Sequence, residues 1–220
     1  MKRVVIFFFL LSSIHCQANW DAEILSETPR IVVIHDFLSF QECDYLINLA
    51  RPALQRSTVV NESSVGSGQV DPRRTSRGTF LTQVHRDQIV QSIEKRLSQL
   101  TNFPRENGES IQMLFYEKGA EYQPHYDFFN PATPGGALHL KRGGQRIATV
   151  IMYLNTPSEG GETIFPVAKI SVVPKKGKAL FFYNCTPSGE TDPAALHGGA
   201  PVICGEKWIA TKWFRMAKFE

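Results

Sequence analysis

Short runs of β-forming residues, separated by turn residues, fill the chain from residue 110 onward. They are IQMLFY, RIATVIMYL, TIFP, ISVVP, ALFFYN and KWIATKWF. Each has the length and composition of a strand. Many short strands at this spacing are typical of a sandwich or jelly roll. We therefore predict a mainly β domain with a jelly-roll core.

Two helices are predicted before these strands. The first, SFQECDYLINLARPAL, has Ser39 as N-cap and Glu42 at the capping-box position, and it follows an entry strand in PRIVVIHDFL. Its apolar residues recur at helical spacing: Phe40, Cys43, Ile47, Ala50 and Leu54. The second helix covers residues 87–100, with one apolar stripe formed by Ile89, Ile93, Leu97 and Leu100. We expect both helices to brace the outside of the jelly roll.

The segment between the helices, NESSVGSGQVDPRRTSRGTFL, is rich in Gly, Ser and Arg and has no sustained apolar period. This pattern predicts a long loop that becomes ordered over a ligand. A solvated surface loop is the alternative.

The first residues, MKRVVIFFFLLSSIHCQANW, have a basic start, an apolar run and a small residue at Ala18. This is the pattern of a secretory signal, so we predict a signal peptide at residues 1–18 and a single domain at residues 19–220. The apolar run is shorter than the roughly 20 residues that cross a bilayer. An uncleaved anchor is the alternative. The expected location is the secretory pathway: endoplasmic reticulum lumen, periplasm or exterior.

Composition excludes some partners. The chain has 220 residues, of which 42% are hydrophobic and 20% charged, which is ordinary for a globular domain. Its net charge of +3 includes Lys2 and Arg3, and indicates neither a nucleic-acid tail nor a polyacidic surface. We expect no nucleic-acid partner.

Export would place Cys43, Cys185 and Cys204 where disulfides persist. Cys185 and Cys204 flank two apolar segments that could be neighbouring strands, so a bond between them is left open, with Cys43 as a buried helix residue. Because no CxxC occurs, zinc and thioredoxin-like sites have little support. Asn61 and Asn184 begin the glycosylation motifs NES and NCT, and we expect the second to go unused beside a buried strand.

Candidate metal ligands occur in EYQPHYDFFNP and DPAALHGGAPV. Side chains alternate along a strand, so His125 and Asp127 should point the same way. His197 lies 70 residues later, where a strand should resume. Two histidines and one carboxylate form the facial set that holds non-haem Fe(II) and leaves positions open. Zinc hydrolysis fits the same ligands, and an isolated histidine is often only structural.

Lys207 separates these alternatives. It lies in a predicted apolar strand, KWIATKWF, where a lysine needs a partner. A co-substrate that carries a carboxylate would supply that partner. A zinc hydrolase has no evident use for such a lysine.

The motifs HYD, LHGG and GEKWIATKW, with QMLFYEKGAEYQPHYDFF, QRIATVIMYLN and EGGETIFP, stand in an order that resembles the prolyl 4-hydroxylase family of 2-oxoglutarate-dependent Fe(II) dioxygenases. The resemblance covers roughly residues 30–218. It implies a double-stranded β-helix in which His125, Asp127 and His197 bind Fe(II) and Lys207 binds the distal carboxylate of 2-oxoglutarate. It also implies that Tyr116 reaches that carboxylate, with Thr149 as its neighbour. A core aromatic is the alternative for Tyr116.

The resemblance implies hydroxylation of peptidyl proline at C4 with O2 and 2-oxoglutarate, releasing succinate and CO2, with ascorbate to rescue the iron. The expected substrate is a proline-rich peptide in polyproline II conformation, which suits an aromatic-lined groove. Tyr122, Arg146 and Trp213 are the residues expected in that groove, with packing or surface roles as alternatives.

Other parts of the chain bear on how the peptide enters. The segment RRTSRGTF resembles the family's mobile lid, with Arg74, Ser76 and Arg77 free to contact peptide. The segment NPATPGGALHLKRGG exceeds the family pattern and is expected to line the entrance.

The chain resembles short, stand-alone members, so no obligate partner subunit is expected, nor any membrane contact beyond an N-terminal anchor. A sibling 2-oxoglutarate oxygenase that acts on another protein side chain or a free amino acid is the alternative enzyme. A jelly-roll binding module without turnover is the alternative outside enzymes.

Overall fold

The computed structural model describes residues 20–61, 68–186 and 188–219. The predicted signal peptide at residues 1–18 lies outside the described residues. Among those residues, no helix is both long and apolar enough to cross a membrane.

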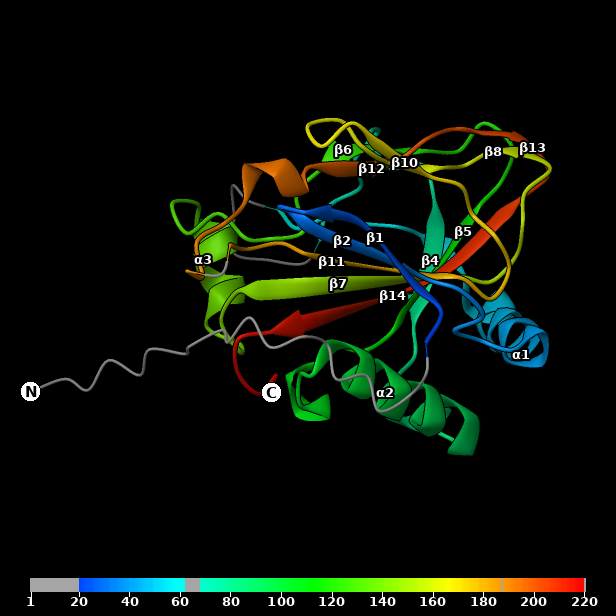
Figure 1. Cartoon of the computed structure of the whole chain (residues 1–220), viewed down its shortest axis with the longest axis horizontal. Coiled ribbons are helices and arrows are strands. Elements are labelled where there is room, and N and C mark those ends of the chain that lie inside the picture. The colour runs from blue at the N-terminus through cyan, green and yellow to red at the C-terminus, as the bar shows by residue number, and fades with distance from the viewer. Residues whose placement is uncertain (1–19, 62–67, 187, 220) are drawn as a thin grey trace, which may run out of the picture.

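An eight-stranded antiparallel sheet forms the larger layer, in the order β1-β2-β11-β7-β14-β5-β4-β3. Its strands are β1 (Ala22–Glu27), β2 (Arg30–Ile34), β3 (Gln55–Arg56), β4 (Arg77–Phe80), β5 (Gln112–Tyr116), β7 (Arg146–Tyr153), β11 (Ala179–Tyr183) and β14 (Lys207–Arg215). Figure 1 shows β7, β11 and β14 side by side at the centre of this layer.

The smaller layer lies against the larger sheet (Figure 1). It contains a four-stranded sheet in the order β10-β9-β12-β6 and a β13-β8 pair. The strands are β6 (Tyr122–His125), β8 (Glu159–Gly160), β9 (Thr163–Phe165), β10 (Ile170–Val172), β12 (His197–Gly199) and β13 (Val202–Cys204). These two layers confirm the predicted jelly roll.

Alternation along the strands divides the core into two clusters. One face of the large sheet, including Val150 and Ala210, packs against the helices, while the other, including Ile151 and Ile209, faces the small sheet. The cavity described below opens on this second, inner face.

Both predicted helices are present and cover the outer face of the large sheet: α1 (Phe40–Ala50) and α2 (Gln88–Thr101). The predicted capping box of Ser39 and Glu42 is confirmed, and Asp87 caps α2 by accepting from the Val90 amide. A short third helix, α3 (Pro134–Leu140), lies in the segment expected to line the entrance.

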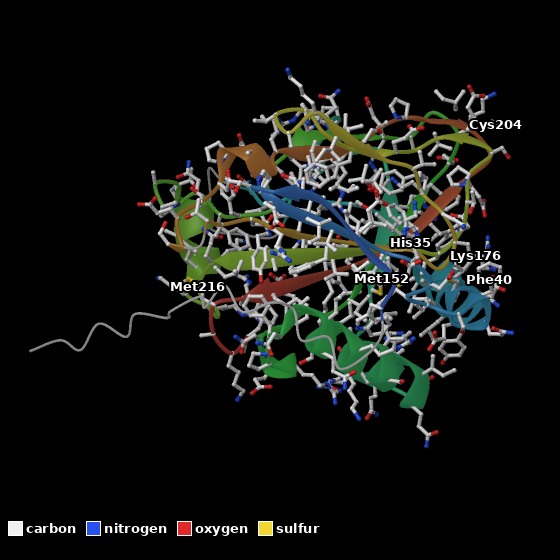
Figure 2. The ribbon with its side chains drawn as sticks, viewed as in Figure 1. His35, Phe40, Met152, Lys176, Cys204 and Met216 are labelled. Carbon is white, nitrogen blue, oxygen red and sulfur yellow. The ribbon has the colours of Figure 1, made fainter. Side chains whose placement is uncertain are left out.

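Two residues of the predicted apolar stripes are exposed instead. Phe40 is 57% exposed, and the Lys176 ammonium lies 5.2 Å from its ring centroid (Figure 2). Ile89 is also exposed, and Val90 takes the buried position at the start of α2. Both exposed residues lie in the first turn, where the helix is only beginning to meet the sheet.

The predicted loop between the helices is partly wrong, because it contains β4, which pairs with β5 near the edge of the large sheet. The disulfide left open between Cys185 and Cys204 does not form: the three cysteines within the described residues are free thiols. Cys185 follows β11 in the large sheet, whereas Cys204 ends β13, which pairs with β8 at the far end of the molecule (Figure 2). The two cysteines are therefore not on neighbouring strands.

Candidate active site

His125, Asp127 and His197 come together on the small sheet. His125 ends β6 and His197 begins β12, and the two residues are paired directly across the antiparallel ladder. One ligand atom from each of the three residues lies within 4.8 Å of the others. The prediction that both His125 and Asp127 lie on a strand is wrong, because Asp127 lies in the bend after β6. The bend still turns its carboxylate toward both imidazoles.

Backbone carbonyls fix the orientation of both imidazoles. The Nδ1 atom of His125 lies 2.9 Å from the Gln123 carbonyl oxygen, and that of His197 lies 3.0 Å from the Ala195 carbonyl oxygen. A carbonyl only accepts, so each Nδ1 carries a hydrogen, which leaves Nε2 as the nitrogen that can bind a metal. His125 Nε2 lies 3.7 Å from Asp127 Oδ1, and His197 Nε2 lies 3.5 Å from Asp127 Oδ2.

The protonation states suit metal binding. Burial, and then the neighbouring His197, hold the pKa of His125 well below its usual range, so its imidazole is neutral at pH 7. Burial opposes ionisation of Asp127, but the facing imidazoles outweigh it and lower the pKa of the carboxyl. The neutral imidazole of His125, the imidazole of His197 and the Asp127 carboxylate face one point, which fits the donor set of a non-haem Fe(II) site.

The three ligands border a cavity of about 1360 Å³ on the inner face of the large sheet. Asp127 and His197 are buried, whereas His125 is half-buried. A metal held here would be anchored on one side and open to ligands on the other.

Lys207 lines the same cavity as an unpaired cation. It begins β14 opposite Tyr116 of β5, is 2% exposed, and its Nζ lies 5.2 Å from the Tyr116 ring centroid. Its Nζ makes no hydrogen bond or salt bridge with any described residue. Burial lowers the pKa of Lys207 to about 8, with Glu162 acting in the opposite direction. A buried ammonium without a partner fits an anionic ligand, such as the carboxylate of 2-oxoglutarate.

Thr149 does not lie where it was predicted. It pairs with Trp213, which is six residues along β14 from Lys207, or roughly 20 Å at strand rise. Its hydroxyl instead donates to Asp127 Oδ2 at 2.7 Å. Thr149 therefore lies beside Asp127, away from Lys207.

Thr163 of β9 lies on the Lys207 side of the same cavity. It is 2% exposed, lines the cavity, and its Oγ1 lies 2.7 Å from the Tyr153 hydroxyl. Its partner on the neighbouring strand is Gly199. A side chain at position 199 would have its Cβ 3.6 Å from Lys207 Nζ, so this strand pair runs beside the Lys207 ammonium. The signal that could have revealed Thr163 is its place in EGGETIFP, as the one hydroxyl residue of that strand.

The residues predicted for the peptide groove, Tyr122, Arg146 and Trp213, all line the cavity. The Tyr122 ring stacks on His125 at a centroid distance of 3.5 Å. The Arg146 guanidinium lies 3.9 Å from the Trp213 ring centroid. Trp213 Nε1 is buried and has no hydrogen-bond partner among the described residues.

Glu109 was missed by the sequence analysis. Its carboxylate binds Arg146 through two hydrogen bonds of 2.6 and 2.9 Å and also accepts from Arg215 at 2.6 Å. It precedes β5 in a segment without periodicity, so no pattern marked it. Glu109 holds Arg146 against Trp213, because the bidentate bond fixes the plane of the guanidinium.

The lid prediction is wrong for Arg74 and Ser76, which are 6% and 0% exposed. Arg74 donates to the Thr58 carbonyl and to Gln112, and covers the Tyr122 ring at 4.7 Å. These residues form part of the inner wall because the strand that follows them joins the large sheet, and Arg77 alone of the three is exposed.

The segment predicted to line the entrance does border the cavity, through Asn130, Pro131, His139 and Arg142. Asn184 is fully buried, consistent with the expectation that its glycosylation motif goes unused.

Comparisons with known proteins agree with this site. The family model of the 2OG-Fe(II) oxygenase superfamily matches residues 111–215. Prolyl 4-hydroxylase 5 and prolyl 4-hydroxylase 1 of Arabidopsis thaliana are 46% and 48% identical to the chain, each alignment covering 90% of it and 72% of the relative. The 2OG complex of the viral collagen prolyl hydroxylase from Paramecium Bursaria Chlorella virus-1 is 32% identical, with a TM-score of 0.65 over 84% of this chain and 95% of that one. The chain belongs to the prolyl 4-hydroxylase family of 2-oxoglutarate- and Fe(II)-dependent oxygenases.

Proposed function

We propose that this enzyme hydroxylates C4 of prolyl residues in an extended, proline-rich peptide, with O2 and 2-oxoglutarate as co-substrates. One observation carries the proposal: a single cavity joins the His125, Asp127 and His197 cluster to the unpaired Lys207 and to a wall of Tyr122, Arg146 and Trp213.

Within this proposal, His125, Asp127 and His197 hold Fe(II), while Lys207, Tyr116 and Thr163 hold the distal carboxylate of 2-oxoglutarate. When bound, Fe(II) and 2-oxoglutarate supply the oxidative decarboxylation to succinate and CO2 that activates O2 for insertion into a C–H bond. Ascorbate is proposed as the reductant that restores the iron after unproductive turnover.

The inner face of β14 sets the order of the ligands along the cavity. Lys207, Ile209, Thr211 and Trp213 all line it, and alternate residues follow one another at about 6.6 Å along a strand. The anionic end of the co-substrate therefore lies near Lys207, and the peptide near Trp213. Ile151 and Ile209 line the cavity between these ends, where apolar side chains exclude water from the co-substrate.

Trp213 and Arg146 position the peptide. A polyproline II chain makes no internal hydrogen bonds, so its carbonyls remain available as acceptors. The stacked side chains of Trp213 and Arg146 offer a flat surface to such a peptide, while the Tyr122 ring, which also lines the cavity, is already in contact with His125 and Arg74.

The alternatives have less support. Lys207 argues against zinc hydrolysis, and the names of the curated relatives favour proline over another side chain. We further propose that residues 19–220 act as one domain in a secretory compartment, supported by the signal-like sequence of residues 1–18.

The test is mass spectrometry of a Pro-Pro-Gly peptide incubated with the enzyme, Fe(II), 2-oxoglutarate and ascorbate in air. Succinate is followed in parallel, with Asp127→Ala as the control enzyme and free proline as the control substrate. We expect one added oxygen per modified proline, identified as 4-hydroxyproline after hydrolysis. Succinate release without peptide oxidation would refute the substrate class, and oxidation of free proline alone would favour the sibling oxygenase.

A further inference from the structure

A chain of two hydrogen bonds connects Asp127 to the interior of the large sheet. The Thr149 hydroxyl lies 2.7 Å from Asp127 Oδ2, and Asn184 Nδ2 lies 2.9 Å from Thr149 Oγ1. Thr149 and Asn184 are 0% exposed and Asp127 is 7% exposed. Water is excluded from this contact, so a donor or acceptor that loses its partner here cannot hydrogen-bond to solvent instead.

The chemistry of the three groups fixes the direction of both bonds. Asn184 Nδ2 can only donate to Thr149 Oγ1, so the single Thr149 hydroxyl hydrogen points at Asp127 Oδ2, which accepts it. Thr149 Oγ1 can then only accept from Asn184, which must present its NH2 group. Asn184 Oδ1 is left buried without a partner among the described residues.

This orientation has a cost that packing alone does not explain. A buried acceptor without a donor lowers the stability of the fold, whereas apolar side chains of similar shape at both positions would be nearly neutral. The polar pair is therefore better explained by what it does to Asp127 than by packing.

The pair is rigidly mounted, whereas Asp127 is not. Thr149 lies in the middle of β7, paired on one side with Phe182 and on the other with Trp213. The backbone N–H of Asn184 donates to the Ile147 carbonyl at 2.8 Å. The backbone carbonyl of Asn184 accepts from the Asp192 N–H at 3.0 Å. Asp127 lies beyond the end of β6, so strand pairing does not fix its side chain.

We propose that Thr149 and Asn184 are positioning residues that hold Oδ2 of Asp127 by hydrogen bonding, which would leave Oδ1 as the oxygen available to a metal. The inference rests on the metal site of the proposed function. Monodentate binding matters because a second carboxylate oxygen would take one of the positions that co-substrate and O2 require. Residues that orient a ligand in this way commonly affect metal affinity about 10- to 100-fold.

The test uses the full chain loaded with Co(II). Co(II) affinity is measured by competition with a chelating dye, and the coordination of the bound Co(II) is followed by its visible d–d spectrum. Thr149→Val removes the hydroxyl and keeps the shape, and Thr149→Ser keeps the hydroxyl and loses a methyl. We expect Thr149→Val to weaken Co(II) binding about 10- to 100-fold and to alter the spectrum. Thr149→Ser should restore both. Asn184→Leu should cause a smaller loss in the same direction, because Thr149 can still donate.

The outcomes separate this inference from the proposed function. Thr149→Val with wild-type Co(II) affinity and spectrum would overturn the positioning role. Equal losses in Thr149→Val and Thr149→Ser would also overturn it, because they would assign the effect to packing. Should Thr149→Val fail to fold, as judged by thermal melting without metal, Asn184→Leu decides by the same two readouts. Asp127→Ala with unchanged affinity would instead refute the metal site itself.

Discussion

Replacement of Lys207 with methionine should make the ligand-free enzyme more stable while removing its affinity for 2-oxoglutarate. Lys207 is 2% exposed, its ammonium has no hydrogen bond or salt bridge among the described residues, and burial lowers its pKa from 10.5 to about 8. At about 1.4 kcal/mol per pH unit, this shift corresponds to about 3 kcal/mol of folding free energy lost in the empty site. Methionine is similar in length and carries no charge.

The sign of the effect depends on pH. Below about pH 8 the lysine is protonated in both the folded and unfolded states. The full loss of folding free energy caused by burying its charge is therefore present at pH 7. Between about pH 8 and 10.5 the folded enzyme releases the proton first, and the cost disappears as pH rises. Wild type should therefore gain stability relative to Lys207→Met over this window.

The magnitudes can be measured by calorimetry. Since 1 kcal/mol changes Tm by about 2–4 °C at this size, Lys207→Met should melt several degrees above wild type at pH 7 without co-substrate. Loss of a buried charge partner costs about 2–5 kcal/mol of binding, so the Kd for 2-oxoglutarate, measured with Mn(II), should rise at least about 30-fold. Added 2-oxoglutarate should stabilise wild type and leave the variant unchanged.

Lys212 provides the matched control, because it lies on the same strand with similar burial but on the opposite face. Its Nζ donates to Glu94 at 3.1 Å, so Lys212→Met breaks a buried pair and should cost about 3–5 kcal/mol of stability. Its 2-oxoglutarate affinity should stay unchanged. A Lys207→Met variant that melts below wild type, or that still binds 2-oxoglutarate, would refute the reasoning.

Other predictions follow from the same cavity. Asp127→Ala should abolish turnover and Co(II) binding without unfolding the protein; residual wild-type turnover would contradict the ligand assignment. The kcat/KM for 2-oxoglutarate should fall about tenfold per pH unit above about pH 8, as Lys207 loses its proton; a flat profile through pH 9.5 would exclude the ion pair. Trp213→Ala should raise the peptide KM, because its side chain lines the cavity wall beside Arg146, and leave the 2-oxoglutarate KM unchanged; equal changes in both would return Trp213 to the core. Glu109→Gln should lower the free energy of unfolding by several kcal/mol because Arg146 and Arg215 lose their common partner; an unchanged Tm would contradict this.

Local rules predicted the parts of the fold that depend on neighbouring residues. The capping box of Ser39 and Glu42 needs only residues three apart, and strands β5, β7, β9, β10, β11 and β14 follow from β-forming runs bounded by turn residues. His125, His197 and Lys207 were found because each is a polar residue in a segment otherwise suited to burial.

The errors arise where the sheet register decides. Both Thr149 and Thr163 are buried hydroxyls on strands that line the cavity, but only the pairing of β7 with β14 shows that Thr149 lies far from Lys207. Likewise, Arg74 was predicted to be free because its segment is polar, whereas β4 draws it into the wall. Glu109 is separated from Arg215 by 106 positions, and no local pattern reports such a contact.

The direct pairing of His125 with His197 has a consequence for local opening of the protein. The small sheet consists of strands of three or four residues, so few backbone hydrogen bonds hold β6 to β12. A metal bound by both histidines would join these two strands much as a covalent cross-link does, and it would be released whenever they separate. Amide hydrogen exchange in β6 and β12 should therefore slow on metal loading, while exchange in β7 and β14 stays unchanged. In this view the metal belongs to the architecture of the small sheet as much as to its chemistry.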